Sequence, residues 1–514
     1  MRYLSRSSLA ILAGLLLTFT ACQREAIQED ITEFTPESAN MTKAEINAVV
    51  ENHLQTTNTV FDWNDASTEL VYSALAYGGH EAQLGYQPAG FEGIDERIHE
   101  IDVTSDSWRA VRDQLIQDLI EATERIIGQS LSEEELIVAP EDGILPILEV
   151  KILHPQILAE FRTRPDVRYL EPATYEPAEV QIRSDAGCDV NPSFSIPSAD
   201  FSTTSAGAKI PWNFNYMNIP QAWNTSVGNN IGIAIIDTGT SPNQNKLMGG
   251  FSSGASSGRY HSRYGTYVSS WWPWASPDGP NDQCGHGTQM AGLAAAPNTG
   301  GGATVGAAYQ ANLISYRGTS DVVVNGSREK RGVRDALVAA GNRSDVKIIS
   351  MSIGDVFSSS TVRDGINYAY NRGKLIFAAA GTSLTWTSWW GVIFPANLWN
   401  TTAVTGIQTG SPMQRCNTCH DGSQVDFVAI MQRRENTDRT SLTLAMSGNT
   451  PAYVGGSSAA TATTAGIAAL VWATNPGQSR ATVLHRMKQA ASIYPGRSSN
   501  FGWGIVDANY AVNN

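Results

Sequence analysis

Residues 455–470 read Gly-Gly-Ser-Ser-Ala-Ala-Thr-Ala-Thr-Thr-Ala-Gly-Ile-Ala-Ala-Leu. Small residues at nearly every position are typical of a helix that packs closely against its neighbours, and the glycine pair is typical of a tight turn into that helix. Two adjacent serines, Ser457 and Ser458, stand at its start. The stretch therefore predicts a buried helix with a hydroxyl group at its entrance.

Two earlier segments carry the groups that turn a serine into a nucleophile. Residues 233–239 form an apolar strand that ends in Asp237, and residues 284–288, Cys-Gly-His-Gly-Thr, place His286 at a helix start. A nucleophilic serine needs a base to take its proton and a carboxylate to orient that base. Each motif alone is also typical of an ordinary turn or helix cap. The chain order Asp, His, Ser favours a catalytic triad.

These motifs and their spacing resemble those of the subtilisin-like serine peptidases, or subtilases, over roughly residues 205–512. Residues 212–223 resemble the segment that opens the catalytic domain in that family, and residues 501–508 resemble the segment that closes it. The resemblance implies a three-layer α/β domain with a mostly parallel sheet over residues 207–514. It also implies that the serine attacks a peptide carbonyl, forming an acyl-enzyme.

The choice between the two serines follows from the helix register. The family pattern is Gly-Thr-Ser-Met-Ala-x-Pro, followed by a helix that ends Ala-Gly-x-Ala-Ala-Leu. Counting back without a gap from residues 465–470 places Ser458 on the nucleophile and Ser457 on the family threonine. Choosing Ser457 would require a one-residue insertion, which turns a helix face by about 100°. We therefore expect Asp237, His286 and Ser458 to be the catalytic residues.

The oxyanion hole is where this chain departs from the family. One donor should be the backbone N–H of Ser458 at its helix N-terminus. The family usually has Asn as the second donor after Ala-Ala-Gly, but here Thr382 occupies that position. Removing such a donor costs about 10²–10³ in turnover. Two interpretations stay open: Thr382 is the second donor of an active enzyme, or the chain is a weakly active pseudopeptidase or peptide-binding scaffold.

The resemblance also predicts where the substrate binds. Residues 348–354 match the strand whose edge pairs with the residues before the scissile bond, and the end of residues 375–381 forms the other wall of the pocket. The expected substrate-binding residues are Ser352, Ile353, Gly354, Ala379, Ala380 and Gly381. Continuous apolar runs are also typical of any buried parallel strand. The small residues suggest a roomy, uncharged pocket for protein or peptide substrates.

The N-terminus predicts export. Arg2 and Arg6 precede the apolar run 9–19, which is too short to cross a bilayer and is typical of a secretory signal. Cys22 then follows at a position that resembles a bacterial lipoprotein box, although Phe19 stands where Leu is usual. Residues 1–22 are therefore expected to be a signal peptide, with lipidation at Cys22 anchoring the protein to a membrane. Secretion without an anchor is the alternative.

Four cysteines remain, and an even number in an exported protein predicts two disulfides with three possible pairings. They are Cys188, Cys284, Cys416 and Cys419. The last two could instead form a redox or zinc pair, but with His420 they supply only three ligands. We expect no cofactor, assign no metal site, and find nothing basic or patterned that suggests nucleic acid.

Charge divides the chain. Residues 23–187 hold 33 acidic and 11 basic residues, a net charge of −22, whereas the part from Cys188 onward carries +6. Opposite charges favour docking of the two parts. Expected strands and helices in the acidic part resemble the ferredoxin-like α+β prodomain of subtilases, which inhibits its own catalytic domain. They are strands at 97–103, 144–152 and 166–170 and helices at 105–128 and 154–164.

The sequence therefore predicts an exported serine endopeptidase that is made as an inhibited zymogen. Its regions are an unassigned acidic region at residues 23–94, the inhibitor-like prodomain at 95–175, a linker at 176–206 and the catalytic domain at 207–514. Self-cleavage is expected between about Glu171 and Gly187, upstream of Cys188.

Overall fold

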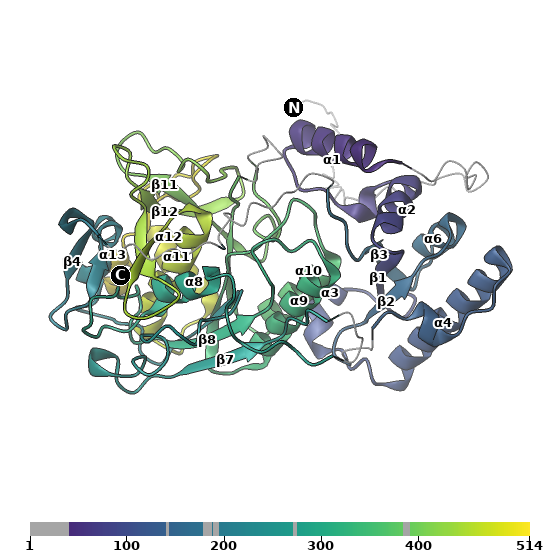
Figure 1. The fold of residues 1–514 in the computed structure, drawn as a ribbon, viewed down its shortest axis with the longest axis horizontal. Coiled ribbons are helices and arrows are strands. Elements are labelled where there is room, and N and C mark those ends of the chain that lie inside the picture. The colour runs from purple at the N-terminus through teal and green to yellow at the C-terminus, as the bar shows by residue number, and fades with distance from the viewer. Residues whose placement is uncertain (1–40, 140–142, 178–187, 189–194, 271–274, 384–390) are drawn as a thin grey trace, which may run out of the picture. The chain divides into compact units, whose positions relative to one another are not determined.

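The computed structural model describes residues 41–139, 143–177, 188, 195–270, 275–383 and 391–514 (Figure 1). Its centre is a seven-stranded sheet in which every pair of neighbouring strands is parallel. The spatial order is β12 (Val425–Gln432), β11 (Thr402–Gln408), β10 (Leu375–Ala379), β9 (Val346–Met351), β6 (Gly232–Asp237), β8 (Asn312–Arg317) and β7 (His261–Gly265).

Strand β6 shows how the sequence produces a layered domain. All six of its residues are buried. Side chains alternate across a strand, and Ile233 and Ile235 accordingly pack into one hydrophobic core while Ala234 and Ile236 pack into another. The first core is shared with helices α8 (His286–Ala295) and α11 (Gly456–Ala473), and the second with α9 (Ser327–Asn342) and α10 (Ser360–Asn371). The expected three-layer α/β fold is confirmed.

Helix α11 confirms the buried helix expected from the small-residue stretch. Every residue from Ala459 to Trp472 is buried. An added Cβ at Gly466 would lie 2.7 Å from the Cβ of Ala307 and 3.0 Å from the carbonyl oxygen of Ala294 in α8, so a larger residue would push the two helices apart. The buried hydroxyls bond to carbonyls four residues back, which satisfies them inside the helix. They belong to Thr461, Thr463 and Thr464.

Shorter elements complete this domain. The helices are α7 (Ile219–Ala222), α12 (Arg480–Gln489) and α13 (Ala508–Asn513), and two antiparallel pairs join β4 (Phe201–Thr203) to β5 (Lys209–Pro211) and β13 (Ser441–Leu444) to β14 (Pro451–Val454). None of the helices in the described ranges is both long enough and apolar enough to span a membrane.

The N-terminal part has its own antiparallel sheet, in the order β2 (Ile147–Lys151), β1 (Glu81–Tyr86), β3 (Val167–Pro172). Its main helices are α1 (Lys43–Thr57), α2 (Thr68–Tyr77), α4 (Asp106–Ile127) and α6 (Pro155–Arg162). Two of the expected strands and both expected helices are confirmed as β2, β3, α4 and α6. The three described strands include one, β1, that lies in the region the sequence left unassigned.

The strand expected at residues 97–103 is wrong. Those residues follow the short helix α3 (Ile94–Arg97) and contain the 3-10 helix η4 (Ile98–Glu100). Ile98 and Ile101 are three residues apart, a spacing that also fits one helical turn. Strand β1 was not predicted because its sequence, Glu-Ala-Gln-Leu-Gly-Tyr, contains no β-branched residue, and β-branched residues are typical of strands.

Candidate active site

The end of strand β6 meets the start of helix α8 at a buried carboxylate–imidazole pair. Asp237 is fully buried and His286 is 3% exposed. His286 Nδ1 lies 2.8 Å from Asp237 Oδ1 and 3.0 Å from Oδ2. An added Cβ at Gly287 would lie 2.2 Å from the carbonyl oxygen of Gly239. Glycine at both positions therefore allows the end of β6 and the start of α8 to approach each other.

A second buried carboxylate, Asp282, stabilises this junction. It was not among the site residues predicted from the sequence. Its Oδ1 accepts hydrogen bonds from the backbone N–H groups of two loop residues and from one hydroxyl, while Oδ2 accepts the N–H and hydroxyl of a third residue. The distances to Oδ1 are 3.0 Å from the Cys284 nitrogen, 2.7 Å from the Gly285 nitrogen and 2.9 Å from the Thr238 hydroxyl. The distances to Oδ2 are 2.9 Å from the Thr288 nitrogen and 2.6 Å from the Thr288 hydroxyl. An acidic residue just before a helix start is a capping signal that could have identified it.

The surroundings of His286 prepare it to take up a proton. Burial alone would lower the pKa of the imidazole, but the charge of Asp237, its hydrogen bond and the charge of Asp282 raise the pKa above its usual value of 6.5. The Thr238 N–H donates to Asp237 Oδ1 at 2.8 Å and helps to hold the carboxylate. Because Nδ1 faces Asp237, Nε2 is the ring nitrogen available on the cavity side.

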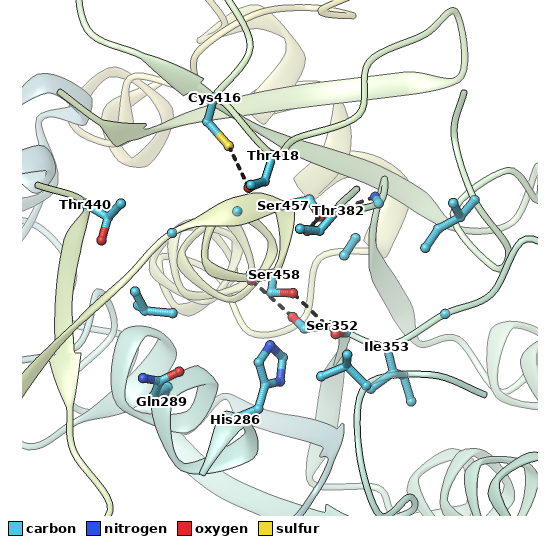
Figure 2. Close-up of a pocket in the computed structure, with 18 of the residues that line it drawn as sticks. His286, Gln289, Ser352, Ile353, Thr382, Cys416, Thr418, Thr440, Ser457 and Ser458 are labelled. Atoms are coloured by element: carbon cyan, nitrogen blue, oxygen red, sulfur yellow. Dashed lines mark hydrogen bonds between the residues drawn. The ribbon is translucent and has the colours of Figure 1, made fainter. Parts of the chain in front are cut away.

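Ser458 lies in the first turn of α11, on the same cavity as His286 (Figure 2). Its hydroxyl donates to the Ser352 carbonyl at 3.4 Å, and the Ser352 hydroxyl donates to the Ser458 carbonyl at 3.1 Å. Among the described residues no hydrogen bond joins Ser458 to His286. Such bonds are often long in active sites without substrate. Ser458 is partly exposed, whereas Ser457 is fully buried.

Thr382 follows strand β10 and lies on the other side of Ser458 (Figure 2). Its hydroxyl oxygen is 3.2 Å from Ser457 Oγ, which also accepts the backbone N–H of Gly381 at 3.2 Å. The amides in the first turn of a helix have no acceptor within the helix. The N–H of Ser458 and the hydroxyl of Thr382 are thus donors beside one cavity.

The cavity measures about 400 Å³ and brings together most of the residues expected from the sequence. Its lining includes Ser352, Ile353, Gly354, Ala379 and Gly381, besides His286, Thr382 and Ser458. Ala380 is not part of the lining but lies in a hydrophobic core. The reason is the alternation of side chains along an extended chain, which turns Ala380 away from the face of its neighbours.

The structure joins Cys416 to Cys419 and Cys188 to Cys284 in disulfides. Cys416 and Thr418, in the loop closed by the Cys416–Cys419 bridge, line the cavity. This wall of the cavity was not predicted from the sequence. This loop also holds the backbone beyond β10: the Ser383 N–H donates to the Thr418 carbonyl at 2.8 Å. In the described part of the chain, no cluster of side chains could hold a metal ion.

Comparison with known proteins finds a family match over more than half of the chain. The model of the subtilase family, Peptidase S8, matches residues 228–504. The thermostable alkaline protease of Halalkalibacterium halodurans is 30% identical over 305 residues, which cover 59% of this chain and 73% of that protein. The alkaline elastase YaB of Bacillus sp. (strain YaB) is 28% identical over 399 residues, covering 77% and 87%.

A solved structure gives the same fold. Fervidolysin from Fervidobacterium pennivorans, described as a keratinolytic enzyme related to subtilisin, matches with a TM-score of 0.57 and 16% identity. The match covers 85% of this chain and 61% of fervidolysin. At this identity the likeness concerns the fold alone.

The electrostatic origin of the raised His286 pKa is testable by histidine ring-proton NMR. In the parent protein we expect a titration midpoint above 6.5. Asp237→Asn removes the nearby negative charge, so the pKa of His286 should fall and the ring should lose its proton at lower pH. Asp438→Asn, an exposed matched control, should leave the midpoint in place. An unchanged midpoint in Asp237→Asn would refute the assignment of the shift to this carboxylate.

Proposed function

We propose, because the chain belongs to the subtilase family of serine peptidases, that Asp237, His286 and Ser458 hydrolyse internal peptide bonds of proteins through an acyl-enzyme. The observation that carries the proposal is the buried 2.8 Å hydrogen bond between Asp237 and His286 on the same cavity as Ser458. A buried titratable pair beside a partly exposed hydroxyl is the arrangement that nucleophilic catalysis requires.

In the proposed reaction, Ser458 Oγ attacks the substrate carbonyl while His286 Nε2 takes the hydroxyl proton. Asp237 stabilises the imidazolium that forms and keeps Nδ1 as the protonated nitrogen. His286 then gives its proton to the leaving amine, and the acyl group stays on Ser458. Water attacks this ester while His286 takes its proton, and His286 then gives that proton to Ser458 Oγ as the ester bond breaks and the second product leaves.

The negative oxygen of each tetrahedral intermediate needs hydrogen-bond donors. We assign this role to the N–H of Ser458 and the hydroxyl of Thr382. The helix N-terminus adds a favourable dipole at the first donor. A threonine hydroxyl is shorter than the asparagine side chain that the family usually has, so the second donor depends on how the hydroxyl is aimed.

The substrate is proposed to lie extended along Ser352, Ile353 and Gly354, with the side chain at the cleavage point against Ala379 and Gly381. No Asp, Glu, Lys or Arg occurs among the described residues that line the cavity. A charged side chain would lose its hydration there without gaining a partner. We therefore infer a preference for uncharged side chains at the cleavage point.

A weakly active peptide-binding scaffold is the second candidate, and Thr382 is the feature that favours it. The buried pair of Asp237 and His286 favours the enzyme, because burying an ionisable pair is costly and has no evident purpose in a scaffold.

Labelling with a fluorophosphonate, which reacts with activated serines, tests the proposal. The purified protein should be labelled at Ser458 and should cleave an unstructured protein substrate. Ser458→Ala should lose both label and cleavage, whereas Ser457→Ala should keep the label and measurable activity. An unlabelled parent protein, or label retained in Ser458→Ala, would sink the proposed chemistry.

We also propose that the N-terminal part acts as an inhibitory prodomain, and that it begins ahead of residue 95 because β1 is the central strand of its sheet. The 399-residue alignment supports this, since it extends well beyond the family match. Buried polar contacts join this part to helices α9 and α10. Arg168 pairs with Asp364 at 2.7 and 2.8 Å, and Glu149 pairs with Arg331 at 2.5 and 3.0 Å.

The end of this part leads towards the cavity. Lys330 donates to the carbonyls of Pro172 and Ala173 at 3.2 and 2.9 Å. Glu176 is close enough to Asp321 to contribute to the raised pKa of that carboxyl, after the larger effect of burial. The residues that follow Asp321 line the cavity. This course supports a cleavage point between Glu171 and Gly187, of which residues 178–187 lie outside the described residues.

The prodomain proposal predicts a graded response to charge removal. Arg168→Gln removes the cationic partner of the buried Asp364, which keeps the hydrogen bond from the Tyr169 hydroxyl. Breaking a buried ion pair costs about 3–5 kcal/mol, so the change should weaken inhibition of the catalytic domain. Arg125→Gln removes an exposed pair with Glu160 and should change inhibition little. Inhibition should also weaken as salt rises, because exposed charges more than about 8–10 Å apart are screened.

Mass spectrometry of the matured protein checks the cleavage point. We expect its N-terminus between Glu171 and Gly187. A cut upstream of Cys188 leaves no disulfide between the two products, because Cys188 pairs with Cys284. A mature N-terminus beyond Asn213, or equal inhibition by the Arg168→Gln and parent segments, would contradict the assignment.

Export and anchoring rest on residues 1–22, which lie outside the described residues. We propose that Cys22 is lipidated and that the lipid alone attaches the protein to a bacterial membrane. The parent protein should then sediment with membranes and be released by detergent but not by salt. Cys22→Ser should appear in the soluble fraction. Unchanged sedimentation of this variant would contradict lipid anchoring at Cys22, and a parent protein already found in the soluble fraction would favour simple export.

A further inference from the structure

The buried side-chain hydroxyl of Ser457 lies close to two polar groups. Neither contact belongs to the regular hydrogen-bonding pattern of a helix or a sheet. Ser457 is fully buried in the first turn of α11. Its Oγ lies 3.2 Å from the backbone nitrogen of Gly381 and 3.2 Å from the hydroxyl oxygen of Thr382. Both neighbours follow strand β10, which ends at Ala379.

The direction of the hydrogen bonds follows from what each group can do. A backbone N–H can only donate, so Ser457 Oγ accepts from Gly381. The proton of a buried hydroxyl also needs an acceptor, because an unsatisfied buried donor costs about 1–3 kcal/mol. Among the hydrogen bonds of the described residues, Thr382 Oγ1 is the one acceptor available to Ser457. The proton therefore points from Ser457 to Thr382.

This direction leaves the proton of Thr382 free to point elsewhere. The Thr382 oxygen accepts from Ser457, so its own O–H does not return along the same contact. Thr382 is partly exposed and lines the cavity beside Ser458. Glycine at position 456 leaves space for this hydroxyl, because an added Cβ there would lie only 3.2 Å from its oxygen.

The backbone that carries Thr382 is also fixed. It forms an antiparallel bridge with Cys419, and the neighbouring Ser383 N–H donates to the Thr418 carbonyl at 2.8 Å. The disulfide between Cys416 and Cys419 closes the loop on the far side of this bridge. With the backbone held, the aim of the hydroxyl depends on the rotation of the Thr382 side chain and of its O–H bond.

We propose that Ser457 is a positioning residue that aims the Thr382 hydroxyl at the oxyanion. Donors that are aligned before the reaction stabilise developing charge without reorganisation. The chain from the Gly381 N–H through Ser457 to Thr382 thereby replaces the fixed amide donor that the side chain of Asn would supply. This inference rests on the proposed function, since it concerns the donors of the same oxyanion hole.

Steady-state kinetics on one peptide substrate test the inference. Ser457→Ala removes the proton that orients Thr382, and kcat should fall on the order of 10-fold with KM little changed, because the interaction forms mainly in the transition state. Ser457→Thr keeps a hydroxyl and should recover most of the rate. Thr382→Val should cost on the order of 10-fold to 10³-fold in kcat, with KM little changed.

Double mutants separate positioning from a structural role. In a Thr382→Val background, adding Ser457→Ala should cost less than about 2-fold, because the hydroxyl to be aimed is gone. In a Thr382→Asn background the cost should again be under about 2-fold, since an amide carries fixed N–H donors. Equal losses from Ser457→Ala in all three backgrounds would mean that Ser457 only supports packing, and no loss in the parent would mean that Thr382 is aimed without it.

End-point fluorophosphonate labelling keeps this test apart from the proposed function. Each variant should still be labelled fully at Ser458, which shows that it is folded with an intact nucleophile. A parent protein without cleavage or label would overturn the proposed function itself. An active, labelled parent whose Ser457→Ala variant is equally fast would overturn the positioning role alone.

Discussion

The hydrogen bond between Asp237 and His286 is the interaction on which the rest of the site depends. Both groups are buried, and removing one partner of a buried ionic pair costs about 3–5 kcal/mol. The pair therefore demands that strand β6 end and helix α8 begin within hydrogen-bonding distance. Glycine at positions 239 and 287 permits that approach, and Asp282 ties the loop between them with five hydrogen bonds. The motifs Asp-Thr-Gly and His-Gly-Thr supply the residues that form this junction.

The second half of the site obeys a similar constraint with different chemistry. Helix α11 must bring its first turn to the cavity while its remaining length lies in the core, and its alanine, glycine and threonine residues allow that close packing. The same turn then serves two purposes. Ser458 faces the cavity, and Ser457, one residue earlier, faces the end of β10 and Thr382 (Figure 2). Adjacent serines are thus divided between proposed chemistry and proposed positioning because successive residues on a helix point about 100° apart.

The fold and the residues that meet at the cavity could be predicted from the sequence, because short motifs in a fixed order indicate both. All but two of the residues expected from Asp237 to Ser458 line one cavity. Asp237 is fully buried against His286, and Ala380 is turned into a hydrophobic core by strand alternation. Asp282 and the loop of Cys416 and Cys419 were not assigned to the site, because their importance lies in long-range contacts that no local pattern records. Strand β1 was missed for a different reason: its residues pack well in the sheet but have low intrinsic strand preference.

Proton NMR of the resting protein tests the central claim most directly, that a buried carboxylate holds His286 through Nδ1–H. The account predicts a single far-downfield proton resonance, slow to exchange with solvent because His286 is 3% exposed. The resonance should persist in Ser458→Ala and disappear in Asp237→Asn. A resting protein without this resonance, or a resonance that survives in Asp237→Asn, would contradict the account.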